Sequence, residues 1–252
     1  DNYPYPTFNR KFYLSNDHVA CISKVTHDIV QTVAPEVDSS YIPHAVNEEV
    51  FKPYPAEEVK AWRLSKNLDD KFVCVWNSRN ARRKQSGTLI WWFKEFLDKV
   101  GHDKACLIMH TDVKDQHGQD LEAIIHELGL TNGEVLFSRD KVSAADLAGM
   151  YNMADLTICI SDAEGFGLST LESLSCGTPI LVNMTGGLQD QVTDGEQFFG
   201  IGLQPTSKAI IGSQQVPFIY EDRLNKDDFL NALTELYEMT PDARRELGMA
   251  GR

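Results

Sequence analysis

Between about residue 72 and residue 182, short apolar runs alternate with longer stretches in which apolar side chains recur at helical spacing. The short runs are typical of buried strands, and the recurring positions are typical of helices with one buried face. Strands are predicted at 71–76, 105–109, 134–137, 156–160 and 179–182. Helices are predicted between them, around 89–100, 121–128, 143–151 and 168–176.

This alternation of strand and helix predicts an α/β fold. Strands that are separated by helices pair in parallel, through right-handed crossovers that place helices on both faces of the sheet. We therefore expect a doubly wound, Rossmann-like parallel sheet. Ligands bind such sheets beyond the carboxyl ends of the strands, so a functional site is expected there.

The first 54 residues have a different pattern. Their predicted elements are a strand at 19–22, a helix opened by Ser23, and extended, proline-containing segments at 41–43 and 51–55. One strand–helix unit cannot bury a core of its own. We therefore expect residues 1–54 to be the tail of a preceding domain with a linker. Residues 55–252 are expected to be a C-terminal domain that is truncated at its C-terminus.

Beyond residue 192 the pattern is less regular. The predicted elements are a short strand at 198–202, a loop at 208–220 and a helix at 226–238. Thr240 followed by Pro241 is typical of the start of a further helix, because proline is favoured at the first helical position. Of the neighbouring Trp91 and Trp92, we expect one to be buried and the other to be partly exposed.

Composition and charge narrow the class of protein. With 42% hydrophobic and 24% charged residues, the chain is an ordinary globular protein. Its formal net charge of −13 argues against a general nucleic-acid-binding protein, which would present a basic face. The five cysteines show no metal-ligand spacing, so we expect buried, reduced thiols.

No membrane span or secretion signal is visible in the sequence. No apolar run approaches the roughly 18 residues that a spanning helix needs, and no signal-peptide pattern opens the chain. We therefore expect a cytoplasmic protein, with peripheral membrane association left open.

The segment that follows the fourth predicted strand has the composition of an anion site. Gly165 and Gly167 allow a tight turn and the close approach of a ligand to the backbone. The helix is predicted to begin near Leu168, and its first amides have no acceptor within the helix. They carry the positive end of the helix dipole and suit a diphosphate. Glycine is also favoured in any turn between a strand and a helix, so the glycines alone do not decide.

Two glutamates lie on either side of this predicted anion site. Glu164 is in the turn, and Glu172 is in the second turn of the helix. A carboxylate next to a phosphate is unfavourable unless it binds a neutral group, and sugar hydroxyls are suitable because they donate hydrogen bonds to it. We therefore expect Glu172 to hold a ribose and Glu164 to hold a sugar.

A basic segment follows the first predicted strand. Residues 79–84 include four cations, and their place at the carboxyl end of a strand favours anion binding over a solvated loop. We expect Arg79 and Lys84 to neutralise the diphosphate. Because the sequence has no DxD pair, it does not indicate a divalent cation held by carboxylates.

These residues together resemble the signature of the group 1 retaining glycosyltransferases. In that signature, two glutamates are separated by seven residues, as Glu164 and Glu172 are. The pair Arg79 and Lys84 is similar to the family's basic pair on the donor diphosphate. The resemblance covers about residues 15–200, and it includes segments at 147–155, 175–180, 42–47 and 51–53.

The resemblance implies a GT-B fold of two Rossmann-like domains, with residues 55–252 as the C-terminal, nucleotide-sugar-binding domain. It implies retention at the anomeric carbon, with no metal and no cofactor beyond the donor. The residues implied in catalysis are Glu164, Arg79 and Lys84. The residues implied in donor binding are Gly165, Phe166, Gly167, Leu168, Ser169, Thr170 and Glu172, with Phe137, Ser138 and Arg139 near the base and Thr111 facing the same crevice.

Two positions depart from the family or fall outside its pattern. Many members have a glutamate after a Gly-Gly turn, where this chain reads Gly-Gly-Leu-Gln-Asp-Gln at 186–191, so no role is assigned to this turn. His44 lies in the predicted linker. We expect it to be a capping or packing residue, and not the family's histidine near the donor sugar, which belongs to the N-terminal domain.

The expected function is transfer of a hexose from a nucleotide-diphosphate sugar to a hydroxyl acceptor, which could be a glycan, a lipid or a small molecule. The alternative is a nucleotide-sugar-binding module without activity, because most of the N-terminal half is absent. A dehydrogenase-type domain is disfavoured because no GxGxxG follows a strand. A phosphorylase is disfavoured because no lysine context for pyridoxal phosphate is evident. The base, the sugar and the acceptor stay open.

Overall fold

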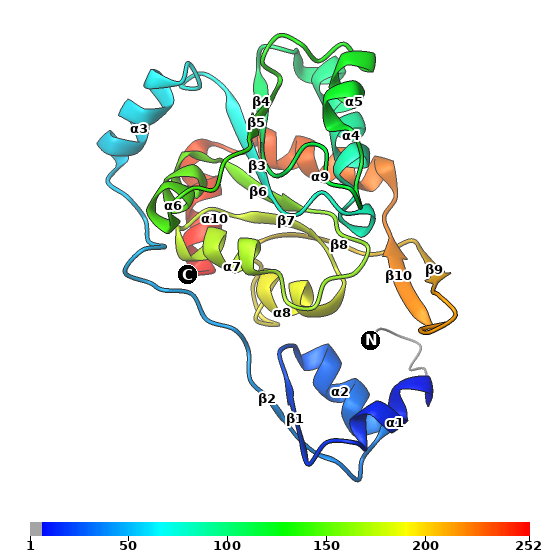
Figure 1. Ribbon diagram of the computed structural model, residues 1–252. Helices are drawn as coiled ribbons and strands as arrows, with labels where there is room; N and C mark the ends of the chain where they lie inside the picture. Colours follow the sequence, from blue (N-terminus) through cyan, green and yellow to red (C-terminus); the bar gives the residue numbers. More distant parts are fainter. Residues whose placement is uncertain (1–6) are drawn as a thin grey trace.

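A six-stranded parallel sheet forms the centre of the computed structural model, which describes residues 7–252 (Figure 1). Residues 1–6 of the predicted N-terminal tail lie outside the described residues. The strand order is β5-β4-β3-β6-β7-β8. The strands are β3 (Phe72–Asn77), β4 (Ala105–His110), β5 (Val135–Ser138), β6 (Leu156–Cys159), β7 (Ile180–Asn183) and β8 (Gly200–Leu203). The predicted α/β class and all five predicted strands are confirmed, and β8 matches the short strand expected at 198–202.

Alternating side chains of each strand explain why helices cover both faces of the sheet. In β3, Phe72, Cys74 and Trp76 pack into the core on one face. Val73 and Val75 pack into a second core on the other face. All of these side chains are buried, so the strand is apolar throughout its length, as expected of a parallel strand covered on both sides.

The first face is covered by helices α4 (Ser86–Val100), α5 (Leu121–Glu127) and α9 (Lys226–Glu238). The apolar face of α4 includes Trp92, which is buried, whereas Trp91 is 47% exposed, as predicted for this pair. The second face is covered by α6 (Ala144–Met153), α7 (Leu168–Ser175) and α8 (Gln189–Val192). The predicted capping box at the start of α6 is present, with Ser143 and Asp146 bonding each other's backbone amides.

The outer layer is completed by two helices at the amino edge of the sheet. Helix α3 (Ala56–Ser65) packs on α6, and α10 (Pro241–Ala250) packs on α7. Helix α10 begins at the predicted Thr240-Pro241 cap, where the Thr240 hydroxyl accepts a hydrogen bond from the Ala243 amide. The sequence patterns did not predict α3, none of whose residues is buried.

The order of the strands places a crevice at the centre of the sheet. The chain runs from β3 outward to β4 and β5, and then returns to pair β6 with the opposite side of β3. Connections leave β3 and β6 in opposite directions, and the crevice between their carboxyl ends is where doubly wound folds bind ligands.

The N-terminal residues form a small separate unit, which Figure 1 shows beyond α8. It contains the 3-10 turn η1 (Thr7–Asn9), α1 (Arg10–Tyr13), β1 (His18–Cys21), α2 (Lys24–Val33) and β2 (Asp38–Tyr41). Ser23 caps α2 as predicted. Strand β2 was not predicted; it pairs in parallel with β1, so the unit is strand–helix–strand instead of one strand and one helix. Residues 42–55 then cross to the central domain without helix or strand, and they include a turn at 48–50.

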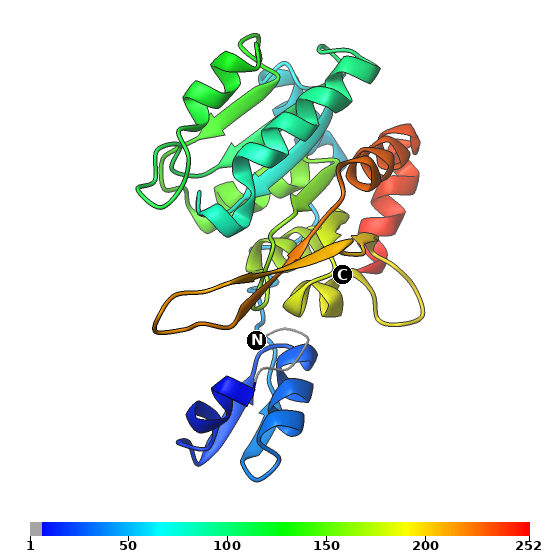
Figure 2. The same ribbon diagram turned by 90° about the vertical axis from the view of Figure 1, so that its right-hand side faces the viewer.

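The prediction of a loop at 208–220 is wrong. This segment forms a hairpin of β9 (Ser207–Ile211) and β10 (Ile219–Arg223), paired antiparallel as a sheet of its own. Figure 2 shows the hairpin extending from the central domain above the N-terminal unit. The pattern was obscured because Gly212 and Pro217 interrupt it and because β10 carries Glu221, Asp222 and Arg223, which look solvated in sequence.

Candidate functional site

The glycine-rich turn after β6 leads directly into α7, as predicted. Gly167 is the N-cap of the helix and has a φ of 95°, a left-handed conformation that favours glycine. The Leu171 amide makes a bond of 3.3 Å back to the Gly167 carbonyl. The amides of Leu168, Ser169 and Thr170 precede this bond, so they are the free donors at the positive end of the helix.

The Gly-Gly turn that departs from the family pattern packs against the glycine-rich turn before α7. It forms the 3-10 turn η3 (Gly186–Leu188). A Cβ atom on Gly186 would overlap the carbonyl oxygen of Glu164, so the two turns are in direct contact. The Gln191 amide group donates to the carbonyl of Phe166 at 2.6 Å and to that of Gly167 at 3.1 Å, and its oxygen accepts from Thr170. Gln191 therefore fixes the backbone ahead of α7.

Two cations of the basic segment meet Glu164. They belong to the 3-10 turn η2 (Arg82–Lys84). The ammonium group of Lys84 bonds the Glu164 carboxylate, and the Arg83 guanidinium lies 3.4 Å from the same oxygen. The Glu164 side chain is only 11% exposed, which strengthens these ion pairs relative to pairs in water.

Arg79 pairs with a different carboxylate, that of Asp115. It forms a two-point ion pair with Asp115, at 2.6 Å and 3.1 Å, and it does not line the cavity that contains Glu164. This pairing lowers the pKa of Asp115 to about 2. The cation that lies beside Lys84 at Glu164 is Arg83, which was not a predicted site residue, and the predicted role of Arg79 at a diphosphate stays a prediction. The spacing of cations in the sequence could not distinguish them, because the direction of each side chain depends on the turn.

Glu172 lies at the end of a hydrogen-bonded relay across three elements. Asn77 at the end of β3 donates to the Tyr151 hydroxyl at 2.8 Å, and that hydroxyl donates to Glu172 at 2.8 Å. Burial raises the pKa of Tyr151, so the phenol stays protonated and able to donate. Burial also raises the pKa of Glu172, although the bond from Tyr151 opposes that shift.

Glu164, Glu172, Arg83 and Lys84 line one cavity of about 500 Å³, a size typical of sites for small molecules. The predicted residues that line it are Glu164, Gly165, Phe166, Gly167, Leu168, Ser169, Glu172 and Lys84. Thr170 is fully buried below them and does not line the cavity. Residues that the sequence analysis did not assign to the site also line it: Ile22, His44, Asn77, Ser78 and Arg83.

His44 is the least expected of these additional residues. Its ring meets the ring of Phe166 edge-on, with centroids 5.1 Å apart. His44 therefore packs, as predicted, but it packs on Phe166 and so contributes a side chain to the wall of the cavity. No sequence signal could have shown this, because the contact joins residues from two separate parts of the fold.

The predicted base-binding residues lie at the same carboxyl edge of the sheet but do not line this cavity. Asn77, His110 and Ser138 are level with one another in β3, β4 and β5. Arg139 lies over the Phe137 ring at 5.7 Å and pairs with Glu122 at 2.7 Å. Thr111 is buried, and among the described residues its hydroxyl has no hydrogen-bond partner.

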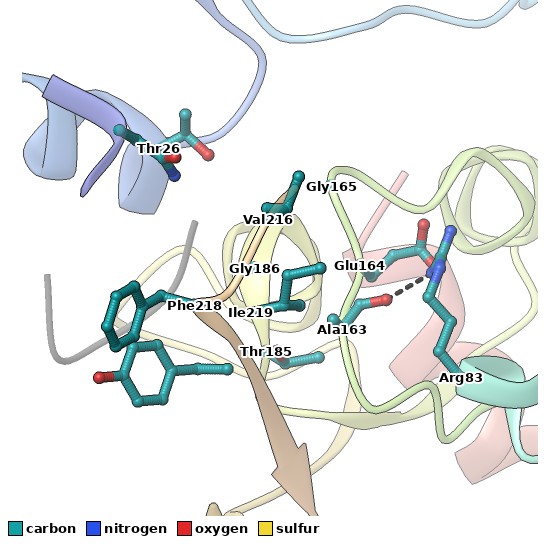
Figure 3. A pocket seen from close by; sticks show the side chains of 12 residues that line it. Thr26, Arg83, Ala163, Glu164, Gly165, Thr185, Gly186, Val216, Phe218 and Ile219 are labelled. Carbon is teal, nitrogen blue, oxygen red and sulfur yellow. Dashed lines mark hydrogen bonds and ion pairs between the residues drawn. The ribbon is translucent and has the colours of Figure 1, made fainter. Parts of the chain in front are cut away.

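A second cavity, of about 380 Å³, meets the first at Glu164 and Arg83 (Figure 3). Thr26 of the N-terminal unit faces it from one side. The β9–β10 hairpin supplies an apolar wall through Val216, Phe218 and Ile219. Charged groups of the first cavity and apolar groups of the hairpin thus lie on opposite sides of this space.

The geometry agrees with the comparison with known families, in which residues 56–252 match the model described as glycosyl transferases group 1. This chain belongs to that family. The predicted resemblance is confirmed, and the match covers most of the chain.

Individual relatives agree with the family. The alpha-galactosylglucosyldiacylglycerol synthase of Streptococcus pneumoniae is 27% identical over 217 residues, which are 85% of this chain and 56% of that protein. The D-inositol 3-phosphate glycosyltransferase of an Arthrobacter species is 32% identical over 109 residues, which are 43% of this chain and 25% of that protein. The chain thus spans about half or less of the length of these relatives.

Solved structures confirm the GT-B fold. A sucrose-phosphate synthase from Thermosynechococcus elongatus superposes with a TM-score of 0.73 at 23% identity, over 96% of this chain and 54% of that one. Anabaena HepE, solved with UDP and glucose, superposes with a TM-score of 0.70 at 18% identity, over 93% of this chain and 57% of that one.

Two features are absent from residues 7–252. Within this range, no helix is both long enough and apolar enough to cross a membrane. Within the same range, no cluster of three or more His, Cys, Asp or Glu side chains could hold a metal ion. The five cysteines are all buried and unpaired, as predicted.

Proposed function

We propose that the protein to which this chain belongs transfers a hexose from a nucleotide-diphosphate sugar to a hydroxyl acceptor, with retention at the anomeric carbon and without a metal ion. One observation carries the proposal. Glu164, Lys84, Arg83 and the free amides at the start of α7 surround a single cavity. That cavity combines cations and amide donors for a diphosphate with carboxylates for sugar hydroxyls.

The donor is proposed to lie along α7. Its diphosphate would accept hydrogen bonds from the amides of Leu168 and Ser169, and Lys84 and Arg83 would stabilise the charge that develops as the diphosphate leaves. Glu164 would accept hydrogen bonds from the hydroxyls of the transferred sugar. Glu172 would accept bonds from the ribose, with Tyr151 fixing the orientation of its carboxylate.

The base is proposed to lie against the ends of β4 and β5, near Phe137, Ser138 and Arg139. The unpartnered hydroxyl of Thr111 supports this position, because a buried hydroxyl without a partner is unfavourable until a ligand supplies one. Arg79 is proposed to approach the diphosphate only by exchanging Asp115 for it. A uridine diphosphate donor is supported by the fold shared with Anabaena HepE, which was solved with UDP.

The acceptor is proposed to enter through the second cavity, since that cavity meets the first at Glu164. Its apolar wall favours an acceptor with an apolar portion beside the hydroxyl. Phe218→Ala is expected to raise the KM for the acceptor while leaving nucleotide affinity unchanged. An unchanged acceptor KM would contradict this assignment.

The diphosphate assignment is tested by calorimetric titration of UDP, GDP and ADP into the chain and its variants. Lys84→Ala and Arg83→Ala are each expected to weaken binding by about tenfold or more, since a charge-assisted hydrogen bond contributes about 1.5–3 kcal/mol. Lys94→Ala is the control, because Lys94 pairs with Asp98 on α4, outside the cavity. Unchanged affinity in both site variants would show that the diphosphate binds elsewhere.

Three further properties belong to this proposal, and the first two have direct tests. Transfer is expected to be unaffected by EDTA, and a requirement for a divalent cation would contradict the metal-free mechanism. The anomeric configuration of the product, read by NMR, is expected to equal that of the donor. A cytoplasmic location is supported by the unpaired cysteines, which suit a reducing compartment.

A second candidate function is a nucleotide-sugar-binding module without turnover. The observation that favours it is the length of the chain, which spans 56% of the Streptococcus relative. Donor hydrolysis or transfer by the purified chain would exclude it. Binding of the donor with no turnover would support it for this chain, and would leave the activity of a longer protein to be tested separately.

A further inference from the structure

The β9–β10 hairpin is joined to the turns of the site by buried charges. Glu221 and Asp222 of β10 are each only 2% exposed. Burying carboxylates is costly unless each one is paired and hydrogen-bonded. A hairpin at the edge of a domain does not need such residues for its own pairing, so their partners indicate what they do.

The backbone links the hairpin to both halves of the proposed diphosphate site. The Asp222 amide donates to the Asp162 carbonyl at 2.7 Å, and the Asp162 amide donates to the Arg83 carbonyl at 2.8 Å. Three segments distant in sequence therefore lie side by side: β10, the turn after β6, and η2. The last two carry Glu164 and Lys84.

Hydrogen bonds between side chains join the same three segments. Glu221 accepts two hydrogen bonds from the Arg82 guanidinium, at 2.6 Å and 3.0 Å, and one from Arg223 at 2.8 Å. Arg223 also donates to the Asp162 carboxylate at 2.6 Å. Arg82 is in η2 and Asp162 is in the turn after β6, so Glu221 and Arg223 tie the two turns together. We call these four side chains the hairpin clamp.

Neighbouring residues add further hydrogen bonds and an ion pair around the clamp. Gln85 has a φ of 57°, unusual for a residue with a side chain, and its amide donates to Asp162. Asp222 accepts a bond from the Thr185 hydroxyl at 2.8 Å and an ion pair from Lys208 of β9. Behind the clamp, Trp92 lines a small cavity of about 190 Å³ together with Gln85, Asp162 and Arg223.

We propose that the hairpin clamp is a positioning device, which sets the distance between the cations of η2 and Glu164 and so shapes the diphosphate site. Glu221 and Arg223 act through Arg82 and Asp162, without contacting the donor themselves. This inference rests on the proposed function for its ligand. Its geometric content, that the hairpin holds η2 against the turn after β6, is testable without one.

The test compares Glu221→Gln with Glu134→Gln in the full chain. Glu134 is the matched control, because it is also a buried glutamate. It lies just before β5, the outermost strand, and it lines neither of the two cavities. In Glu221→Gln, affinity for UDP, GDP or ADP is expected to fall by up to about tenfold, since displaced cations lose part of the free energy that a charge-assisted hydrogen bond contributes. Affinity for the matching nucleoside, which has no phosphate, is expected to stay within about twofold of wild type.

Hydrogen exchange supplies the readout that needs no ligand. The Asp162 amide is expected to exchange faster in Glu221→Gln than in wild type, because its bond to Arg83 is released more often. Arg82→Ala is the second variant. Since the Arg82 side chain is 56% exposed, its truncation leaves the core intact, and it is expected to show the same two effects if Glu221→Gln does not fold.

The outcomes separate the clamp from the proposed function. Wild type that binds none of the three nucleotides would overturn the proposed function, while faster exchange at Asp162 in the variants would still support the clamp geometry. Wild-type binding that is retained in both variants would overturn the positioning role, whatever the exchange shows. Equal losses for nucleotide and nucleoside would also overturn it, because they indicate general destabilisation.

Discussion

Asp162 lies two residues before Glu164, and its carboxyl group is almost fully buried. Burial raises its pKa from the ordinary value of 3.8 to about 6, aided by the nearby charge of Glu221 and opposed by Gln85 and Arg223. A carboxyl group whose pKa is raised by folding binds more protons in the folded state. Its ionisation therefore destabilises the fold as pH rises from about 4 to about 6, and the cost is constant above that range.

Asp162→Asn is expected to remove this dependence on pH. The free energy of unfolding of the variant, relative to wild type, should increase between about pH 4 and pH 6 by roughly 1–3 kcal/mol, because one pKa unit corresponds to 1.36 kcal/mol. Urea denaturation at a series of pH values measures the difference. A difference that stays constant over this range would contradict the raised pKa.

Tyr151→Phe is expected to break the relay between Asn77 and Glu172. Asn77 and Glu172, which are both partly buried, lose a partner, so the free energy of unfolding should fall by about 1–2 kcal/mol, and affinity for nucleosides should weaken. Tyr54→Phe is the control, since the exposed Tyr54 hydroxyl makes a long bond of 3.3 Å to Ala145. Denaturation and nucleoside titration measure both effects, and similar results for the two variants would contradict the relay.

Sequence predicted some of the residues around the cavity better than others. Glu164, Glu172 and the glycines were predictable because a strand, a turn and a helix follow one another in the chain and fix where these residues lie. Arg83 and His44 were not, because their directions depend on contacts with segments distant in sequence. Arg83 meets the turn after β6, and His44 meets Phe166. The functional roles of all these residues stay predictions.

At the scale of elements, the strands and helices that could be predicted have a continuous pattern of apolar residues within their own sequence. Strand β3 and helix α4 are examples, since each buries most of its apolar residues locally. The β9–β10 hairpin is the opposite case. Its Glu221 and Arg223 pair with Arg82 and Asp162, which are far away in the sequence. A pattern read along the chain assigns such residues to solvent.

Gly186→Ala tests the contact between η3 and the turn after β6. A Cβ atom would overlap the Glu164 carbonyl, so the free energy of unfolding is expected to fall by about 1–3 kcal/mol from overpacking, beyond the strain of its left-handed φ of 49°. Gly195→Ala is the control, because Gly195 has a φ of 98° but no atom near its Cβ position. Thermal or urea denaturation measures both; an equal loss in the two variants would argue against the contact.

At the scale of the whole molecule, the carboxyl edge and the amino edge of the central sheet differ in the residues that they carry. The carboxyl edge carries the candidate site. At the amino edge, Arg244 of α10 stacks over Phe72 at 5.0 Å and pairs with Asp155 at 3.1 Å. Arg63 of α3 pairs with the same carboxylate at 2.9 Å. Two helices distant in sequence are thereby fastened to the start of the sheet.

Arg244→Ala is expected to destabilise the fold without affecting the site. Removing one partner of a buried ion pair typically costs about 3–5 kcal/mol, whereas nucleotide affinity at the opposite edge should be unchanged. Arg245→Ala is the control, since Arg245 is exposed on the same helix. Denaturation and nucleotide titration test the two halves of this expectation, and a loss of affinity in the folded variant would contradict the separation of tasks.

The sequence predicted the doubly wound sheet because strands and helices alternate regularly from β3 onward. It did not predict the order of the strands, which is set by how the helices divide between the two faces. Nor could it predict that the N-terminal unit touches the site, since that depends on how residues 42–55 cross to the central sheet.

Trp92, on the wall of the small cavity behind the hairpin clamp, provides an optical signal for the clamp. It lines the same cavity as Asp162 and Arg223, the charged groups that would shift if η2 and the turn after β6 moved apart. Indole emission depends on neighbouring charge and on access of water. Stopped-flow fluorescence of the unlabelled protein can therefore follow the clamp in real time, and Trp92→Phe identifies the part of the signal that comes from this ring.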